Sequence, residues 1–361
     1  MIINKYWFSF LLIKIAYMFL AIYVYGNITT LGDTYTYIYG LKLDYDNFWY
    51  FSTSMMSLLG LLSTSIFGEP LTHFPFLLLS FYGIYYSVSR LKLSNKDLFI
   101  VLVLLSFPSF GIWTSIVSKE SIGVFYMGVI LGYFIDLMEN KNRKIKLIEY
   151  FALYLLFVFK VQYLSAILSI WVYIKLSNFF NLKGNGKLAL LLIHIIIAIF
   201  FLYYFRDLIN EISFKLPNHF SLDGGSTREN NIWVNDYDVF INAPYGMFIG
   251  FWGPTFSEIL EKPIQSFAFI ESFIIFSFFS YFLFKAFILV VNIKRINIFY
   301  FSILLMAVVW LLFVHYPFGV LNPGSAIRYR ENFYGFLVVL LFYIYQKIKL
   351  RYQVEKSSFS Y

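Results

Sequence analysis

Basic side chains that lie away from the chain's Lys and Arg clusters are the first candidates for chemistry. They are Lys119 in TSIVSKES, Lys160 in FVFKVQY, and Arg328 with Arg330 in NPGSAIRYRENF. Arg presents a planar, permanently charged fork that suits phosphate, and Lys presents a compact positive charge. A count of the apolar runs places all of these groups at the outer ends of membrane helices, opposite to the usual side for basic anchors. This pattern predicts a site that holds a diphosphate head group at the outer face.

Carboxylates and aromatic rings accompany these cations. Glu120 follows Lys119, and Asp33 lies just beyond the first apolar run in LGDTYTYIYG. Either carboxylate could accept a proton from a sugar hydroxyl. Tyr37 and Trp113 have rings that can stack on sugars. The expected site therefore combines general-base groups, diphosphate-binding cations and sugar-binding rings.

Structural interpretations of the same residues stay open. The two Arg residues could be snorkelling side chains at a helix end, and one could pair with Glu331. Lys160 could pair with a carboxylate of another helix, such as Glu271. Asp33 could cap a helix, and the Lys-Glu turn at 119–120 could be an ordinary solvated hairpin.

The elements that must position these residues are membrane helices. The chain has 361 residues, of which 60% are hydrophobic and 13% are charged, and apolar runs recur along its whole length. Each run can cross a hydrocarbon core about 30 Å thick as a helix of about 20 residues. We therefore expect an all-α, polytopic integral membrane bundle that forms a single transmembrane domain over residues 1–361. The expected spans, about ten in number, cover residues 6–25, 71–88, 98–113, 121–138, two halves of 147–176, 188–205, 265–291, 298–315 and 332–346.

Charge placement sets the expected topology. Basic clusters near residues 90–96, 141–146, 175–187, 294–295 and 347–356 fall on one side when both termini are cytoplasmic. We expect residues 51–67 to form an interfacial or re-entrant helix, and residues 147–176 to form two short spans that meet outside at Lys160. Residues 206–263 form the one long external loop. Within it, the aromatic segment PYGMFIGFWGP is expected to lie on the surface.

Composition excludes several function classes. The chain has no Cys, and its four His are widely separated. Disulfides, thiolate metal sites and thiol nucleophiles are therefore excluded, and a His-based metal site is not expected. The sequence lacks nucleotide-binding fingerprints, so we expect no cofactor and an already activated substrate. The net charge of +8 comes largely from the basic clusters at helix ends, so nucleic acid is not an expected partner.

Two local patterns resemble one family. The segment PSFGIWTSIVSKESIG resembles the Pro…Trp-x-Ser…Lys-Asp/Glu segment of Wzy-type O-antigen and capsule polymerases, including EpsG-like exopolysaccharide proteins. The segment NPGSAIRYR resembles the Asn-x-Gly…Arg-Tyr-Arg segment of the same family. The expected topology is similar along nearly the whole chain. Lys160 stands where relatives often have Arg, and this departure leaves its role less defined.

The resemblance implies a bundle similar to the GT-C type glycosyltransferases. It implies a polymerase of the bacterial inner membrane that moves a growing glycan from undecaprenyl diphosphate onto an incoming lipid-linked repeat unit at the outer face. Arg328, Arg330, Lys119 and Lys160 would then stabilise the leaving diphosphate, while Asp33 or Glu120 would orient or deprotonate the attacking hydroxyl. Membrane lipid, a flippase and a chain-length regulator are the implied partners.

Other functions remain open at this point. A lipid-linked oligosaccharide flippase would place charges along an internal cavity and would usually show repeated halves, which the sequence lacks. A membrane O-acyltransferase also has about ten spans. The common bacterial type has an Arg and a His early in the chain, and residues 1–30 contain neither. An O-antigen ligase differs only in its acceptor.

Overall fold

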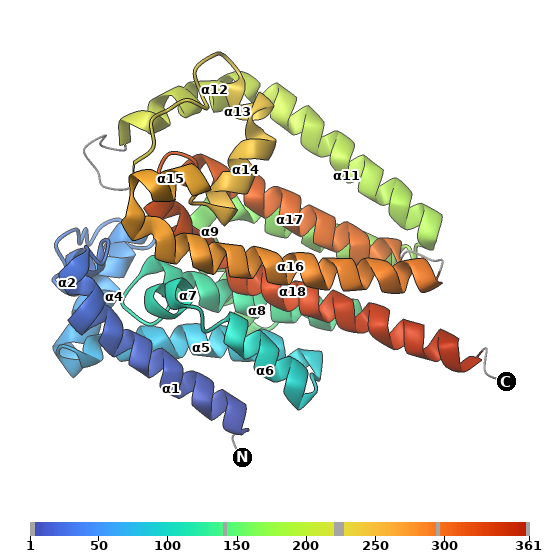
Figure 1. Ribbon diagram of the computed structural model, residues 1–361, viewed down its shortest axis with the longest axis horizontal. Helices are drawn as coiled ribbons and strands as arrows, with labels where there is room; N and C mark the ends of the chain where they lie inside the picture. Colours follow the sequence, from blue (N-terminus) through green and yellow to red (C-terminus); the bar gives the residue numbers. More distant parts are fainter. Residues whose placement is uncertain (1–3, 140–142, 220–226, 294–296, 359–361) are drawn as a thin grey trace. The chain divides into compact units, whose positions relative to one another are not determined.

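Helices make up every regular element in the part of the chain that the computed structural model describes, residues 4–139, 143–219, 227–293 and 297–358 (Figure 1). Seven helical runs there are long and apolar enough to cross a membrane. These features confirm a polytopic helical membrane protein. Parts of two predicted basic clusters (Lys141, Lys294 and Arg295) and residues 220–226 of the predicted external loop lie outside the described residues.

The count of seven differs from the predicted number of spans at three places. Helix α5, Phe74–Val88, is continued by the helical turns η2, Leu71–His73, and η3, Ser89–Leu91, but this run is not among the seven. The predicted span 98–113 is broken into α6, Asn95–Leu104, and α7, Pro108–Trp113. Residues 147–179 count as one apolar run.

The chain divides into two compact units, each described here by itself. The first unit comprises Met1–Leu164 with Glu331–Val339, and the second comprises Ser165–Arg330 with Leu340–Tyr361. Besides α5, α6 and α7, the first unit contains α1 Lys5–Leu20, η1 Ala21–Tyr25, α2 Gly26–Ile28, α3 Thr34–Ile38, α4 Ser52–Phe67, η2 Leu71–His73, η3 Ser89–Leu91, α8 Lys119–Glu139, α9 Leu147–Lys160 and η4 Val161–Tyr163.

Helix α8 is the core of the first unit, since 89% of its apolar window is buried. It packs closely on α5 because glycines remove side chains from the contact. A Cβ atom on Gly128 would lie 2.2 Å from the Gly83 carbonyl oxygen, and one on Gly132 would lie 2.5 Å from the Tyr86 ring. Small residues spaced four apart are typical of membrane-helix interfaces. The GVILG stretch at 128–132 therefore fixes α8 against α5 and, through α8, the residues that precede it.

Helix α4 matches the ambiguous segment 51–67. It has 16 residues, and Ser54, Met56, Ser57 and Gly60 are among those on its buried face. A Cβ atom on Gly60 would lie 2.5 Å from the Tyr37 carbonyl oxygen, so α4 packs directly on α3. At about 24 Å it is too short to cross the bilayer unaided. Its placement as an interfacial or re-entrant helix stays a prediction.

The second unit contains the remaining elements. They are α10 Leu164–Phe179, whose first residue closes the first unit, α11 Gly184–Tyr204, α12 Arg206–Lys215, η5 Leu216–His219, α13 Asp238–Ile241, α14 Ala243–Trp252, α15 Phe256–Glu261, η6 Pro263–Gln265, α16 Ser266–Ile293 and α17 Ile298–Gly319. Helix α18, Pro323–Ser358, contributes residues to both units. Only 11% of the residues in the most apolar stretch of α11, and likewise of α16, are buried, so these helices expose apolar side chains to lipid.

Helix α14 contains most of the aromatic segment PYGMFIGFWGP and packs against α17 on one side, while Tyr245 and Phe248 are exposed on it. The expectation that this segment lies on the membrane surface stays a prediction. A Cβ atom on Gly246 would lie 2.2 Å from the Tyr316 ring, and one on Gly319 would lie 2.9 Å from the Gly250 carbonyl oxygen. Glycine on the facing sides of both helices permits this close approach.

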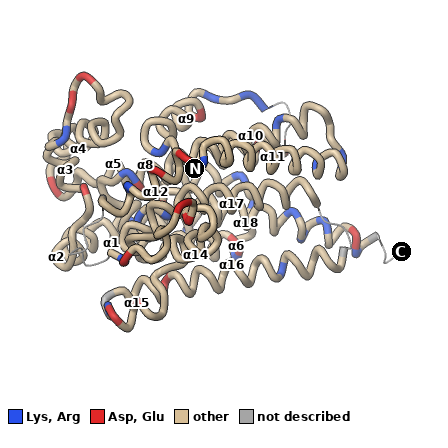
Figure 2. Tube along the Cα trace, turned by 90° about the horizontal axis from the view of Figure 1, so that it is seen from above, with Lys and Arg blue, Asp and Glu red and all other residues tan. Residues whose placement is uncertain are grey.

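Basic side chains gather at one end of the second unit. Lys175, Lys183 and Lys187 lie near the α10–α11 turn, and Lys347 and Lys356 lie in the last part of α18. In Figure 2 blue segments, which mark Lys and Arg, occur on α11 and α18 toward the C-terminus. This distribution agrees with the charge bias that we used to predict the topology.

Candidate functional site

Residues 114–118 form a tight turn between α7 and α8, as predicted, but the turn is not solvated. Thr114, Ser115 and Ser118 are all at most 3% exposed. The turn before Lys119 is therefore not an ordinary solvated hairpin, while its position on the outer side of the membrane stays a prediction. Neighbouring elements supply hydrogen-bond partners to the Thr114 and Val117 backbone groups of the turn.

Side chains from four elements bind this turn. The Thr34 hydroxyl donates to the Val117 carbonyl oxygen (2.9 Å), and the Val117 amide donates to His73 Nδ1 (3.0 Å). The Ser80 hydroxyl donates to the Thr114 carbonyl oxygen at 2.6 Å, and Lys14 Nζ donates to the same oxygen at 3.0 Å. Buried backbone groups need such partners. The turn is thus held in one position, and with it the first residue of α8.

That first residue is Lys119, which is half-buried. Its Nζ donates to Ser52 Oγ at 3.0 Å and to Thr53 Oγ1 at 2.9 Å, both in the first turn of α4. It lies 5.9 Å from the centre of the Tyr37 ring. A cation at a helix N-terminus opposes the helix dipole. Lys119 is therefore a positive group held at a position where a bound anion would be favourable.

Asp33 also contacts Tyr37. The Tyr37 hydroxyl donates to Asp33 Oδ2 at 3.3 Å. Asp33 immediately precedes α3, yet its side chain makes no capping hydrogen bond, and the residue is exposed. The structure thus brings together Asp33, Tyr37 and Lys119, and it gives Asp33 an arrangement different from a helix cap.

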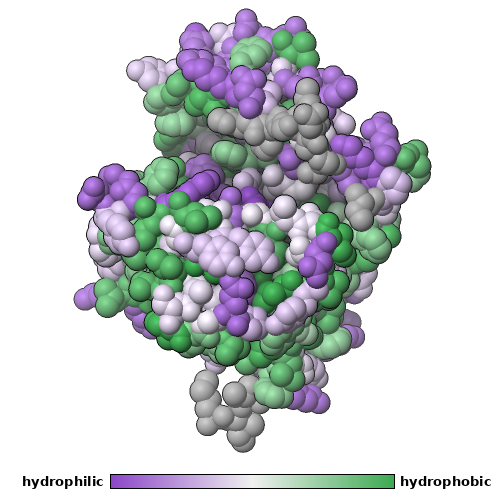
Figure 3. All heavy atoms as spheres, turned by 90° about the vertical axis from the view of Figure 1, so that its left-hand side faces the viewer, coloured by the Kyte–Doolittle hydropathy of each residue, from purple (hydrophilic) through white to green (hydrophobic). Residues whose placement is uncertain are grey.

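The two rings predicted to bind sugar, those of Tyr37 and Trp113, are buried, whereas two other Tyr rings nearby are exposed. Tyr37 is 2% exposed, and Trp113 is 8% exposed and packs on Ala21, Leu31 and Ile116. Neither presents a ring face to a ligand. Tyr35 and Tyr39 are instead 42% and 55% exposed and stack on each other, with ring centres 6.3 Å apart. Figure 3 faces the side of Figure 1 where α2 and α4 lie, and pale and purple side chains interrupt the apolar surface there.

Glu120, the second candidate base, is 4% exposed. It lies in the first turn of α8, where a negative charge suits the helix dipole. Its carboxyl group is close enough to the buried Tyr126 hydroxyl for an electrostatic interaction. Of the two candidate carboxylates, only Asp33 is accessible to a sugar hydroxyl.

Lys160 marks a break in the helical run, as predicted. Helix α9 ends at this residue, whose backbone angles, φ −150° and ψ 63°, are not helical. The side chain is half-buried. The helical run therefore has a break at Lys160, whereas the expectation of two short spans that meet outside there, and the binding of diphosphate by Lys160, stay predictions.

In the second unit, Arg328 and Arg330 lie within α18 and not in a loop before it. Asn322 Oδ1 accepts a hydrogen bond from the Ser325 amide at 2.9 Å, and Pro323 is the first helical residue. The segment Asn-Pro-Gly is therefore a helix start, in which an Asn cap and a Pro at the first position are both favoured. Two residues apart on a helix, the guanidinium groups point to different sides.

The two Arg residues have different surroundings. Arg330 is 1% exposed and forms an ion pair with Glu271, with Nη2 and Oε1 3.2 Å apart. It also donates to Ser272 Oγ (2.7 Å) and to the Phe251 carbonyl oxygen (3.1 Å). Arg328 is half-buried and donates to the Tyr329 hydroxyl at 2.9 Å. Glu271, which we considered as a partner for Lys160, is thus a partner of Arg330.

Two basic residues escaped the sequence analysis. Lys14 is 1% exposed, lies within α1 and also donates to Thr114 Oγ1 at 2.7 Å. Its signal was present, because it is the one charged residue in the stretch 6–32. Arg228 donates to the Val320 carbonyl oxygen at the end of α17 (2.9 Å) and to Glu258 Oε2 (3.0 Å). Because Arg228 lies inside a polar segment of the sequence, its type and position did not predict these contacts.

Comparison of the chain with protein-family models, with curated proteins and with solved structures found no match. Among the described residues, no group of three His, Cys, Asp or Glu side chains could hold a metal ion. The functional argument therefore depends on the residues themselves.

Proposed function

We propose that this chain is a glycosyltransferase that polymerises lipid-linked oligosaccharide repeat units in the bacterial inner membrane. It would transfer the growing glycan from undecaprenyl diphosphate to the incoming lipid-linked repeat unit at the outer face, through a GT-C-like bundle of about ten spans with both termini in the cytoplasm. The observation that carries this proposal is the group formed by Asp33, Tyr37 and Lys119, in which an accessible carboxylate accepts a hydrogen bond from a Tyr hydroxyl and a positioned ammonium lies 5.9 Å from the centre of the same ring. The two motifs that resemble Wzy-type polymerases support the same assignment.

The proposed reaction is a substitution at the anomeric carbon of the donor glycan. The oxygen of the acceptor hydroxyl forms a bond to that carbon, while the bond between the carbon and the diphosphate oxygen breaks. The hydroxyl proton passes to the Asp33 carboxylate, and the electron pair leaves with the diphosphate. Lys119 stabilises the negative charge that grows on the leaving group. Tyr35 and Tyr39, exposed and stacked, offer faces on which a sugar ring can lie.

The cations outside this group take separate roles in the proposal. Arg328 is the diphosphate ligand of the second unit, because a half-buried guanidinium can reach a substrate. Arg330 is a positioning residue, because Glu271 already neutralises its charge within the protein interior. Lys160 is a further candidate ligand at the break between α9 and η4.

The test compares variants of the Asp33 group with matched neighbours. In a strain lacking the chromosomal gene, Lys119→Met should lower polymer formation by about 100- to 1,000-fold, and Asp33→Asn by about 100- to 10,000-fold. Gels should then show single repeat units at normal protein levels. Lys42→Met and Asp46→Asn change exposed side chains between α3 and α4 and should leave full ladders. Full ladders from both Asp33 and Lys119 variants would overturn the proposal.

A purified system separates the alternative functions. The protein in liposomes that contain lipid-linked repeat units should couple them and release undecaprenyl diphosphate. Movement of the lipid between leaflets without coupling would instead identify a flippase. Transfer to lipid A core alone would identify a ligase.

A further inference from the structure

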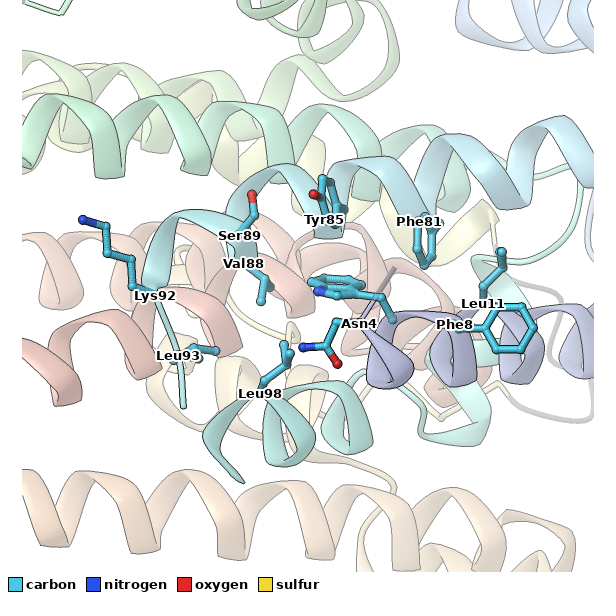
Figure 4. Close-up of a pocket in the computed structure, with 11 residues that line it drawn as sticks. Asn4, Phe8, Leu11, Phe81, Tyr85, Val88, Ser89, Lys92, Leu93 and Leu98 are labelled. Atoms are coloured by element: carbon cyan, nitrogen blue, oxygen red, sulfur yellow. The ribbon is translucent and has the colours of Figure 1, made fainter. Parts of the chain in front are cut away.

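A cavity of about 510 Å³ lies within the first unit, between α1, α5 and the start of α6. Its volume falls in the range of about 300–1,000 Å³ that is typical of ligand sites. Figure 4 shows the labelled side chains of these elements around a common space. The apolar part of the lining consists mainly of Trp7, Phe8, Leu11, Phe81, Val88 and Leu98.

The lining changes from partly polar to apolar along α1. The polar residues Asn4, Ser89 and Lys92 line the end where α1 begins and α5 finishes, together with the apolar Val88, Leu93 and Leu98. The part further along α1 is lined by Phe8, Leu11 and Phe81. Since α1 belongs to a candidate membrane span, this gradient runs from the membrane interface toward the hydrocarbon. A ligand that fits it has a polar head and an apolar chain.

Lys92 supplies the charge at the polar end. Its side chain is exposed, extends to one side of the cavity in Figure 4, and forms no hydrogen bond or ion pair with the residues that the structure describes. Its backbone is left-handed, with φ 52° and ψ 45°, a conformation that costs about 1–2 kcal/mol in a residue other than glycine. Such strain persists only where the surroundings impose it. Nearby Arg90 is already paired with Asp136, so Lys92 is the cation of this rim that is left for a ligand.

We propose that this cavity binds one acyl chain of an anionic phospholipid, with the lipid phosphate at Lys92. The site lies at the end of α5 opposite to His73, and His73 contacts the turn that leads into Lys119. The 15 residues of α5 separate the two ends by about 22 Å. The cavity is therefore a separate site from the Asp33 group. By the charge bias it faces the cytoplasmic leaflet, where anionic lipids attract basic residues.

The test measures lipid binding by the full-length protein. Native mass spectrometry would count bound dioleoyl phosphatidylglycerol and dioleoyl phosphatidylcholine. Lys92→Gln should weaken phosphatidylglycerol binding about five-fold and remove the preference over phosphatidylcholine, as expected for one Lys near an anionic head group. Lys96→Gln, an exposed Lys outside the cavity lining, is the matched control and should keep the preference.

A second pair of variants tests the apolar part. Leu11→Trp fills the cavity and should abolish retention of either lipid, whereas Leu12→Trp changes an exposed neighbour and should not. Lipid binding by Leu11→Trp at the wild-type level would overturn the proposal. Equal binding of both lipids by the wild-type protein, with no change in Lys92→Gln, would also overturn it. Displacement of phosphatidylglycerol by an equimolar polyprenyl phosphate would assign the cavity to a prenyl chain, and competition by inorganic phosphate alone would show an anion site without a chain.

Discussion

Arg328 and Arg330 have side chains that suit one diphosphate, but their spacing on a helix directs the two guanidinium groups to different sides. Two guanidinium groups beside each other in sequence suit one diphosphate, but a helix turns about 200° between residues two apart. Arg330 consequently lies in the interior with Glu271, and Arg328 lies beside Tyr329. The sequence indicated both side chains but could not separate them, because it gave the helix start at residue 332 instead of Pro323.

Alanine at these two positions should therefore fail in different ways. Arg330→Ala leaves the Glu271 carboxylate buried without its partner, and we expect a loss of about 3–5 kcal/mol in the free energy of unfolding. Arg328→Ala should keep the wild-type unfolding midpoint in detergent but yield only single repeat units. Arg330→Met with Glu271→Leu, which removes both charges, should recover much of the stability. Equal unfolding midpoints for the two Ala variants would contradict this division.

For Lys14, in contrast to Arg330, we expect a substitution to lower activity and leave stability nearly unchanged. Replacement by Met, a side chain of similar length, removes two hydrogen bonds to Thr114 of about 1.5–3 kcal/mol each. It also removes the desolvation cost of a buried charge, which is several kcal/mol. The unfolding midpoint of Lys14→Met should thus stay close to wild type, while polymer formation falls at least ten-fold because the turn before Lys119 loosens. Ile15→Met is the control, and wild-type ladders from Lys14→Met would show that the contact has no role in positioning.

At the scale of elements, the sequence predicted helices well and breaks less well. Long apolar runs such as 265–291 and 298–315 became α16 and α17 with ends within four residues of those expected. The break at Lys160 was predicted because a charge in mid-membrane is costly. The break between α6 and α7 was missed although the sequence carries a signal for it, because α7 begins at Pro108 and Pro disfavours a helical conformation of the residue before it. The hydrogen bond from the Tyr17 hydroxyl to the Ser106 carbonyl oxygen (2.9 Å) is a tertiary contact at this break that the sequence does not show. The burial of the turn at 114–118 was missed because it too depends on tertiary contacts.

The contact between α5 and α8 depends on glycine. Gly128→Ala would place a Cβ atom against the Gly83 backbone, so neither partner can yield by a rotamer change. We expect a loss of about 1–3 kcal/mol in the free energy of unfolding. Gly184→Ala, where a Cβ atom would meet nothing within 4 Å, should be neutral. Thermal unfolding of both variants checks this, and equal midpoints would contradict the packing of α8 on α5.

The junction of α15 with the end of α17 should respond to pH. Burial disfavours the charged form of Glu258, but the hydrogen bond and charge of Arg228, with hydrogen bonds from Thr255, outweigh it and lower the pKa of Glu258. A lowered pKa means that the stabilisation is complete above the ordinary Glu value of about 4.3 and is lost as the pH falls through the folded-state value.

Hydrogen exchange around Arg228, whose amide donates to the Leu321 carbonyl oxygen, measures this effect. At pH 7, Glu258→Gln should exchange faster than wild type, and the difference should shrink below about pH 4.3. The pKa of Asp238 is also lowered, mainly by a hydrogen bond from the Asn235 amide. Because Asp238 is present in wild type and in Glu258→Gln alike, its effect on the exchange rate cancels when the two proteins are compared. A difference that is constant with pH would show that the Glu258 charge contributes nothing to this junction.

At the scale of the whole molecule, sidedness decides whether the proposed chemistry is possible. Each unit, taken by itself, has a basic end. In the first unit Lys92 lines the cavity near the start of α1, and in the second unit the basic residues lie near the α10–α11 turn and the end of α18. Basic ends face the cytoplasm in membrane proteins. The Asp33 group and the start of α18 should then face outward, toward a lipid-linked glycan.

The absence of Cys from the sequence makes this orientation directly measurable. Glu69→Cys in the first unit and Ser257→Cys in the second should react with a membrane-impermeant maleimide in intact spheroplasts. Lys144→Cys and Asn185→Cys should react only after permeabilisation. All four positions are exposed, so a missing reaction reports the membrane barrier and not burial. The reversed labelling pattern would place Lys119 on the cytoplasmic side, where a polymerase that uses outward-facing undecaprenyl diphosphate could not work.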